Sequence, residues 1–232
     1  KFPPPKTHFG DQIARYPVGS RRTIFRSDTF GGLTNYWGAT MLPFTDHEFQ
    51  SWPVSATEMR PYYVKIAKVT GISGRKDALT HYFHEDFTTA PPIRAVSMLD
   101  RLDQAINEQQ EQGRFRLVSG INRCAVETRP EQPNHCIYCG ECMVGCLKDS
   151  IYSSRKTFET FLKSPSVKYV QARVTKVESR QRRLTLDQNG TLSTVSGFDR
   201  IFLCAGCPAS TEIIMRSVRF DAVPFSKDNA GA

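Results

Sequence analysis

The stretch Phe30-Gly31-Gly32-Leu33-Thr34-Asn35-Tyr36-Trp37-Gly38-Ala39 is the segment on which our interpretation of the fold depends. Two adjacent glycines allow the backbone to adopt positive φ, and they carry no side chains that would keep a ligand away from the peptide N–H groups. The stretch therefore predicts a loop that lies against a flat or phosphorylated ligand. A plain turn is the alternative, because many Gly-Gly pairs serve only to reverse the chain.

A second loop of small residues is predicted near the other end of the chain. Residues 201–204 are apolar and predict a short buried strand, which leads through Ala205 and Gly206 into a helix over 209–217. The small residues permit a ligand to approach closely, and a helix N-terminus carries a partial positive charge. Such strand–loop–helix units occur in nucleotide-binding sheets, so the two loops together predict one cofactor site. Plain packing of a helix on a strand is the alternative.

The composition is that of a folded chain. Of its 232 residues, 39% are hydrophobic and 11% are aromatic, which predicts one large or two small domains. No apolar run approaches the roughly 18 residues of a membrane span, and the basic residues 1–6 lack the apolar centre of a signal peptide, so we expect no membrane span. The chain lacks an initiator Met and a tail-like end, and we expect it to be an internal piece of a longer protein.

The net charge of +8 arises from 31 Lys and Arg residues against 23 Asp and Glu residues. The basic residues are spread along the chain, and only Arg180, Arg182 and Arg183 form a dense group, just before a predicted hairpin turn. A solvated face explains such a group, so we expect no nucleic-acid partner. A basic module for an anionic polymer is the rival hypothesis, and it predicts binding that weakens steeply with salt.

Several local patterns predict helices and strands. Ser55 and Glu58 have the spacing of a capping box, which starts a helix that ends at Gly71, with Pro61 either kinking it or marking a later start. Asn189-Gly190 predicts the turn of a β-hairpin. Further helices are expected over 93–112 and 153–161, and strands over 23–26, 116–120, 124–127, 167–170 with 172–177, 184–187 and 191–195. The group His81, His84, Glu85 and Asp86 is either a metal site or a packed surface.

Four of the seven cysteines form the run Cys136, Cys139, Cys142 and Cys146. Crowding of this kind is unlike a disulfide framework and predicts a reducing compartment, for which we take the cytoplasm. The C-x2-C-x2-C-x3-C spacing is that of a bacterial ferredoxin, so the run predicts ligands of an iron–sulfur cluster. Against this, Leu147 stands where a Pro is usual, and a remote ligand would have to be Cys124, Cys204 or Cys207. A zinc site and reduced thiols without a metal are the alternatives.

Residues 31–39 resemble the flavin-contacting loop of the glucose-methanol-choline (GMC) family of FAD-dependent oxidoreductases, especially its bacterial sugar and alcohol dehydrogenase-like branch. Three further segments agree in the expected order. Trp52-Pro53-Val54, with Glu58 and Pro61-Tyr62-Tyr63, is similar to the helix after that loop. The cysteine run resembles a Cys-rich element of some members, and residues 205–217 resemble the second family signature.

The resemblance implies an α/β (α+β) fold class, with an incomplete FAD-binding Rossmann-like domain and an inserted substrate or cap region. Residues 1–50 and 166–232 would belong to the FAD-binding domain, and residues 51–165 would form the insertion. Val174 would help to hold the adenine end of FAD, and Ala205 and Gly206 would line the same cleft. The flavin and its phosphates would lie against Gly31, Gly32, Thr34, Asn35, Gly38 and Ala39.

The implied reaction is hydride transfer from the CH–OH group of an alcohol or a sugar to FAD, with an electron-acceptor protein as a further partner. The family's N-terminal Gly-x-Gly-x-x-Gly fingerprint is absent, and so is its C-terminal catalytic His with a His or Asn partner. We therefore name no catalytic residue and expect the chain alone neither to bind FAD tightly nor to turn over substrate. An iron–sulfur electron carrier of the ferredoxin type is the alternative function.

Overall fold

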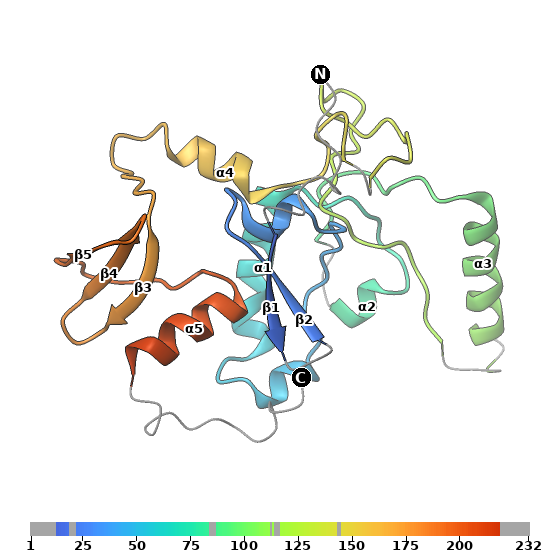
Figure 1. Cartoon of the computed structure of the whole chain (residues 1–232). Helices are drawn as coiled ribbons and strands as arrows, with labels where there is room; N and C mark the ends of the chain where they lie inside the picture. Colours follow the sequence, from blue (N-terminus) through green and yellow to red (C-terminus); the bar gives the residue numbers. More distant parts are fainter. Residues whose placement is uncertain are drawn as a thin grey trace. The chain divides into compact units, whose positions relative to one another are not determined.

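We describe the protein from a computed structural model, in which residues 13–18, 22–83, 87–111, 113, 117–142 and 145–218 are described. The described residues fall into two compact units (Figure 1): Thr29–Phe158 in the first, and parts of Gln12–Asp28 and Glu159–Ala232 in the second. These limits differ from the segments 1–50, 51–165 and 166–232 that the family resemblance implies. The FAD-binding and cap roles of those segments stay predictions.

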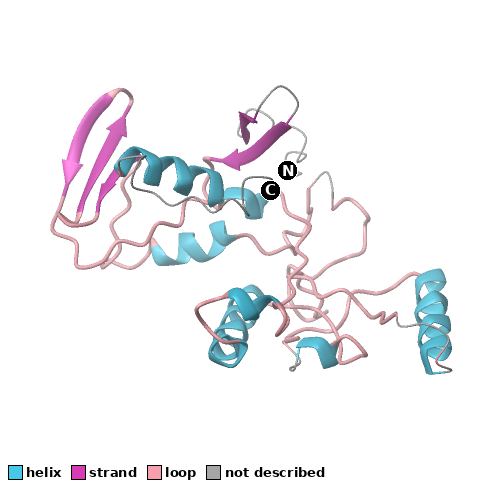
Figure 2. Ribbon diagram, turned by 90° about the horizontal axis from the view of Figure 1, so that it is seen from below, coloured by secondary structure: helices cyan, strands magenta, loops and turns pink. Residues whose placement is uncertain are grey.

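The first unit contains helices and loops but no strand longer than an isolated bridge among its described residues. It holds the short 3-10 turns η2 (Gly32–Asn35) and η3 (Glu48–Ser51), and the helices α1 (Ala56–Thr70), α2 (Thr80–Phe83) and α3 (Ser97–Glu111). Helix α4 (Ser154–Phe161) begins in this unit. Figure 2 shows the described residues between α3 and α4 as loop.

Short extended segments pair around residue 124 and form the centre of the first unit. The Ser73 N–H donates to the Cys124 carbonyl at 2.8 Å, and the Ala125 N–H donates to the Ala39 carbonyl at 2.7 Å. Ala39, Cys124, Ala125 and Val126 form one buried cluster, and Ala67, Ile72 and Phe87 form a second. The expected strand over 124–127 is therefore present only as isolated bridges to Thr40, Ser73 and Ile151.

Helix α1 has the predicted capping box. The Ser55 side chain accepts the Glu58 N–H at 3.2 Å, and the Ser55 N–H donates to Glu58 Oε2 at 2.8 Å. The Ser55 N–H and the Ser55 hydroxyl both donate to Glu58 Oε2, and these two hydrogen bonds lower the pKa of Glu58. The helix continues through Pro61 and ends at Gly71, which has a φ of 68°, so the predicted start and stop are both confirmed.

A buried ion pair ties two distant loops of the first unit together. The Arg123 guanidinium contacts the two Asp77 carboxylate oxygens at 2.8 and 3.0 Å, and the two side chains are only 6% and 11% exposed. Arg123 also donates to the carbonyls of Arg75 and Ile121, and Asp77 accepts the Ile121 N–H at 2.8 Å. Gly120 is required beside this pair, because a Cβ there would lie 2.6 Å from Asp77 Oδ2.

The second unit contains both antiparallel sheets. Strands β1 (Ile13–Val18) and β2 (Arg22–Ser27) form a hairpin, so the predicted strand over 23–26 is confirmed. Strands β3 (Arg173–Glu178), β4 (Arg183–Gln188) and β5 (Thr191–Val195) form a meander in the order β3-β4-β5. Asn189 and Gly190 have φ values of 54° and 88°, as the predicted tight turn between β4 and β5 requires.

Helix α5 (Cys207–Ser217) belongs to the same unit and packs against β3. The Ser217 hydroxyl accepts the Val177 N–H at 2.8 Å, which ties the last turn of the helix to the strand. Ile213 of α5 and Leu186 of β4 are 7% exposed. The helix begins before the expected residue 209, because Pro208 suits the first turn of a helix.

The predicted strand over 201–204 is not present. Phe202 is 80% exposed, and no described strand pairs with this segment. A strand requires a partner for its backbone groups, and the apolar run has none among the described residues. Among the described residues, strands β1 to β5 pair only in an antiparallel manner. The structure therefore shows a general α+β class and gives no evidence of a Rossmann fold.

Three further elements differ from the sequence-based expectations. The helix expected from residue 93 begins at Ser97, and the Val96 carbonyl accepts its first helical hydrogen bond, from the Asp100 N–H at 3.2 Å. The described part of the expected strand 116–120 and the whole of 167–170 are loop, since neither segment pairs with a described strand. The helix expected over 153–161 is confirmed as α4.

None of the helices in the described ranges combines the length and the apolar character that crossing a membrane requires.

We expect Arg123→Met to lower the free energy of unfolding by about 3–5 kcal/mol, because it leaves the buried Asp77 carboxylate without its partner. Urea denaturation of the 232-residue chain measures this loss. Arg101→Met removes an exposed guanidinium from α3 and should change the value by less than about 0.5 kcal/mol. Equal losses of unfolding free energy in the two variants would show that breaking the buried ion pair costs no more than removing an exposed arginine.

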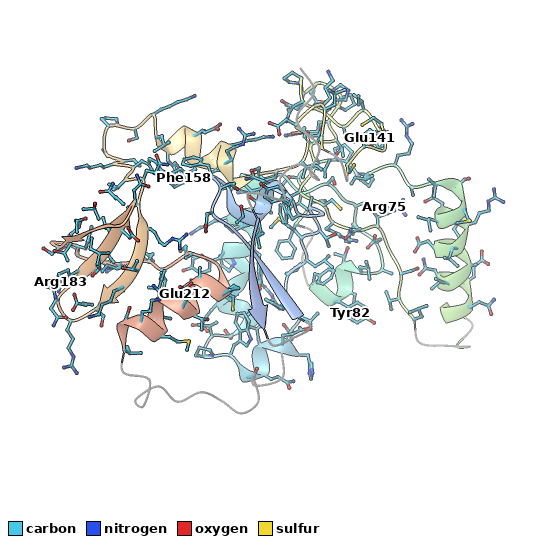
Figure 3. The ribbon with its side chains drawn as sticks, in the orientation of Figure 1. Arg75, Tyr82, Glu141, Phe158, Arg183 and Glu212 are labelled. Atoms are coloured by element: carbon cyan, nitrogen blue, oxygen red, sulfur yellow. The ribbon has the colours of Figure 1, made fainter. Side chains whose placement is uncertain are left out.

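We expect the stabilising effect of Glu178 to depend on pH. The Arg183 guanidinium, labelled in Figure 3, hydrogen bonds to Glu178 and, with Lys176, lowers the pKa of its carboxyl from 4.5 to about 2. A lowered pKa in the folded state stabilises the fold above about pH 4.5, and the effect is lost as the pH falls toward 2. The melting temperature of Glu178→Gln should therefore be lower than that of the wild type at pH 6 and should converge with it near pH 2. Arg180→Gln, which removes an exposed cation of the same turn, should show no such convergence.

Candidate functional site

The glycine loop forms the 3-10 turn η2, entered through two residues with positive φ. Gly31 and Gly32 have φ values of 93° and 56°, which L-residues with side chains rarely adopt. The Gly32 N–H donates to the Thr29 carbonyl at 2.9 Å, and the Tyr36 N–H donates to the Leu33 carbonyl at 3.0 Å. The loop is therefore a defined turn that needs glycine at both positions.

The beginning of α4 holds this loop in place. The Ser154 N–H donates to Thr34 Oγ1 at 3.0 Å, and the Ser154 hydroxyl lies 2.9 Å from the same oxygen and 3.0 Å from the Gly31 carbonyl. The Thr34 hydroxyl in turn donates to the Gly31 carbonyl. Thr34 thus connects the two ends of its own turn and ties the turn to a helix that lies 120 residues further along the chain.

Asn35 and Trp37 add further connections to the same segment. The Asn35 amide nitrogen donates to the Phe30 carbonyl at 2.8 Å and to Thr29 Oγ1 at 3.2 Å, and its oxygen accepts the Ser153 hydroxyl at 2.6 Å. Trp37 Nε1 donates to the Tyr152 carbonyl at 2.8 Å. These side chains build the loop, and their polar groups are already engaged within the protein.

Gly31 also permits close packing on α4. A Cβ at Gly31 would lie 2.9 Å from the backbone N of Arg155 and 2.8 Å from Asn35 Oδ1. One residue earlier, the Phe30 and Phe158 rings pack edge to face, with their centroids 4.7 Å apart (Phe158 is labelled in Figure 3). The loop backbone is therefore pressed directly against the first turn of the helix.

The exposed residues between Gly31 and Ala39 are Leu33, which is 47% exposed, and Gly38. Gly32 and Gly38 have open space where a Cβ would stand, with no described atom within 4 Å, and Gly38 is exposed. Ala39, by contrast, is 1% exposed and has a φ of 61° in the core. Of the six predicted flavin contacts, Gly32 and Gly38 thus present open backbone, Gly31, Thr34 and Asn35 are engaged with neighbouring protein groups, and Ala39 is buried.

The other three predicted cofactor contacts belong to the second unit. Val174 is half-buried in β3, next to a shift in its register with β4. Ala205 and Gly206 are exposed, and Gly206 has a φ of 80° where it precedes the first turn of α5. No side chain caps this helix, so its first turn offers backbone donors of the kind that bind anions, although Pro208 has no N–H and contributes none.

The cysteine run follows a looped path in which Tyr138, Gly140 and Gly145 have positive φ, as does Asp149 just after it. Cys136 packs against the cluster that contains Cys124, and its N–H donates to the Glu127 carbonyl at 2.8 Å. Cys139 and Cys142 are exposed. The described residues include no group of three or more His, Cys, Asp or Glu side chains placed to hold a metal ion, so the four thiols do not converge in this structure.

Cys146 has the most distinctive environment in the run. Its half-buried sulfur accepts the Ser150 N–H at 3.1 Å. Burial raises the pKa of this thiol, but the neighbouring Ser150 hydroxyl and the N–H groups of Ser150, Ile151 and Lys148 lower it by more. The Ser150 hydroxyl is itself buried and forms no hydrogen bond of regular geometry. This environment favours the thiolate form, which is the form that metals bind.

Of the group that the sequence leaves as either a metal site or a packed surface, His81 is exposed in α2, while His84, Glu85 and Asp86 lie outside the described residues.

Two connections that shape the site are not predicted from the sequence. One is the docking of the glycine loop on residues 153–155, although Ser153-Ser154 before a helix is a recognisable start signal. The other is the ion pair between Asp77 and Arg123, two charged residues without a shared local pattern. In both cases the partner is distant in sequence.

No protein-family model matches the chain, and a search of curated proteins finds none with significant similarity to it.

We expect Gly31→Ala to destabilise the protein more than Gly32→Ala does. Both substitutions place alanine at positive φ, which costs about 1 kcal/mol, but only the Gly31 methyl group would collide with Asn35 and Arg155. The added overlap should bring the loss for Gly31→Ala to about 3 kcal/mol. Chemical denaturation of both variants measures the difference, and equal losses would contradict the docking of Gly31 on α4.

Proposed function

We propose that this chain belongs to an FAD-dependent oxidoreductase that acts on the CH–OH group of an alcohol or a sugar. The observation that carries the proposal is the glycine loop, because its turn is fixed by α4 while Gly32 and Gly38 face open space. A loop that is already held in one conformation loses little conformational entropy when a ligand binds. Backbone without side chains suits a flat ring, which is the feature of a flavin that the loop would meet.

The fit to FAD rests on the chemistry of the groups present. The Gly38 N–H is a neutral donor for a flavin oxygen or a phosphate, whereas the Gly32 N–H already donates to the Thr29 carbonyl, so Gly32 contributes only open space. The uncapped first turn of α5, preceded by Ala205 and Gly206, offers a second set of donors for an anionic group such as the pyrophosphate. We further propose that Val174 contacts the adenine end. On this hypothesis residues 1–50 and 166–232 belong to an incomplete Rossmann-like FAD-binding domain, and residues 51–165 form the substrate-facing insertion.

When bound, FAD would supply the redox chemistry by accepting a hydride from the substrate carbon while a base takes the hydroxyl proton. The contribution of this chain is to bind and orient: Thr34, Asn35 and Trp37 fix the loop, and its glycines leave room for the ring. An electron-acceptor protein is the proposed further partner. The crowded thiols of the cysteine run favour a reducing compartment, the cytoplasm.

An iron–sulfur electron-transfer protein is the second candidate function. The spacing of the run and the thiolate-favouring surroundings of Cys146 support it. The positions of the sulfurs do not, because no three of the described cysteines converge on one point. In the arrangement of this structure, the four cysteines do not fit an iron–sulfur cluster.

The test of the flavin proposal is the FAD content of the complete protein that the gene encodes, purified with and without Gly38→Leu. Gly38 is exposed, its φ is not positive and its surroundings are open, so the fold should tolerate leucine. We expect the leucine to reduce bound FAD by about tenfold or more, by blocking the ring. Ala105→Leu adds similar bulk to an exposed position of α3 and should retain FAD.

Absence of flavin from the wild-type protein, or full FAD content in Gly38→Leu, would refute the proposal. Iron and sulfide analysis of the same anaerobic preparations tests the second candidate. Iron that disappears in Cys139→Ser would support a cluster in the run, and a protein without iron would exclude it.

A further inference from the structure

A pocket lies between α3 and the loop over residues 119–122 in the first unit. Its volume is about 300 Å³, and its walls are mainly aliphatic. Leu99, Leu102 and Ile106 line it from the helix, and Ile121 lines it from the loop. This volume is at the lower end of the range for small-molecule sites, which are mostly apolar with a few placed polar groups. None of these residues belongs to the proposed flavin site.

The helix wall of the pocket follows from the spacing of its residues. Leu99, Leu102 and Ile106 are three and four positions apart, so they share one face of α3. Leu99 and Leu102 are nevertheless 51% and 54% exposed. The apolar face of α3 is therefore incompletely covered where it borders the pocket, and an apolar ligand would gain free energy by covering it.

The opposite wall is rigid. The Ile121 N–H donates to the buried Asp77, and the Ile121 carbonyl accepts from Arg123, so the ion pair fixes this loop. Among the other lining residues, the Ser119 hydroxyl donates to Asp103 Oδ1 at 2.5 Å. Arg75, labelled in Figure 3, lies 3.7 Å from the other oxygen of Asp103. Asp103 is thus occupied by protein partners.

Asp100 differs from Asp103. It also lines the pocket and is half-buried, but its carboxylate has no hydrogen-bond or ion-pair partner among the described residues. An aliphatic wall with one unpartnered carboxylate is complementary to a molecule that carries an alkyl chain and a single positive charge. Neutral and anionic molecules of the same length lack that charge complementarity.

We propose that this pocket binds a small aliphatic cation of the primary alkylammonium type. Its chain lies between Leu102 and Ile121, and its charged head group is paired with Asp100. The limited volume favours a single short chain over a fused ring system or a lipid with two chains. The proposal is independent of the flavin, because it uses only α3 and the loop over residues 119–122.

The test is isothermal titration calorimetry of the full 232-residue chain with octylammonium, 1-octanol and octanoate. We expect octylammonium to bind more tightly than 1-octanol and octanoate to bind least. Asp100→Asn should weaken octylammonium binding about two- to fivefold, as expected for a partly exposed ion pair, and leave 1-octanol unchanged. Leu102→Gln should weaken octylammonium and 1-octanol about tenfold.

Met98→Gln is the matched control, because Met98 is on the same helix, is 71% exposed and does not line the pocket. The Met98→Gln variant should bind octylammonium and 1-octanol as tightly as the wild type does. Circular dichroism should show that all variants remain folded. Three results would overturn the proposal: no binding of octylammonium to the wild type, equal affinity for octylammonium and octanoate, or equal losses in Met98→Gln and Leu102→Gln.

Discussion

The ion pair between Asp77 and Arg123 is the interaction on which the first unit depends. It is almost fully buried, and it joins the loop after α1 to the segment that carries Cys124 and Ala125. Isolated ion pairs of this kind add little net stability, because desolvation offsets the attraction, but breaking one is costly. Its main effect is therefore to specify one arrangement of two loops that have few regular backbone hydrogen bonds of their own.

The position of the glycine loop depends on Ala125, which lies in the same segment as Arg123. The Ala39 carbonyl accepts the Ala125 N–H, and the Tyr152 N–H donates to the Ala125 carbonyl at 2.9 Å. Residue 125 thus holds both the end of the glycine loop and the segment that leads into α4, and Thr34 and Trp37 then join the two directly. The loop is fixed from two sides, which leaves Leu33, Gly38 and the open side of Gly32 as its accessible surface. That division explains why Thr34 and Asn35 act as supports in this structure.

The cysteine run shows how spacing and placement can diverge. Its intervals suit a cluster, but Cys136 packs on the core, Cys139 and Cys142 are exposed, and Cys146 accepts backbone N–H groups. Sequence spacing limits which thiols are able to meet, whereas the backbone between them decides whether they do. Here several residues with positive φ turn the chain between successive sulfurs.

The sequence by itself determined the elements that depend on neighbours within a few residues: the capping box of α1, the Asn189-Gly190 hairpin, and the positive φ at Gly31 and Gly32. Only the tertiary structure decided the docking of the glycine loop on α4, the burial of Ala39 and the pairing of Asp77 with Arg123. It also decided that the apolar residues 201–204 form no strand. The reason is physical: a cap or a tight turn satisfies its hydrogen bonds locally, whereas a strand, a buried charge or a docked loop needs a partner that the sequence does not place.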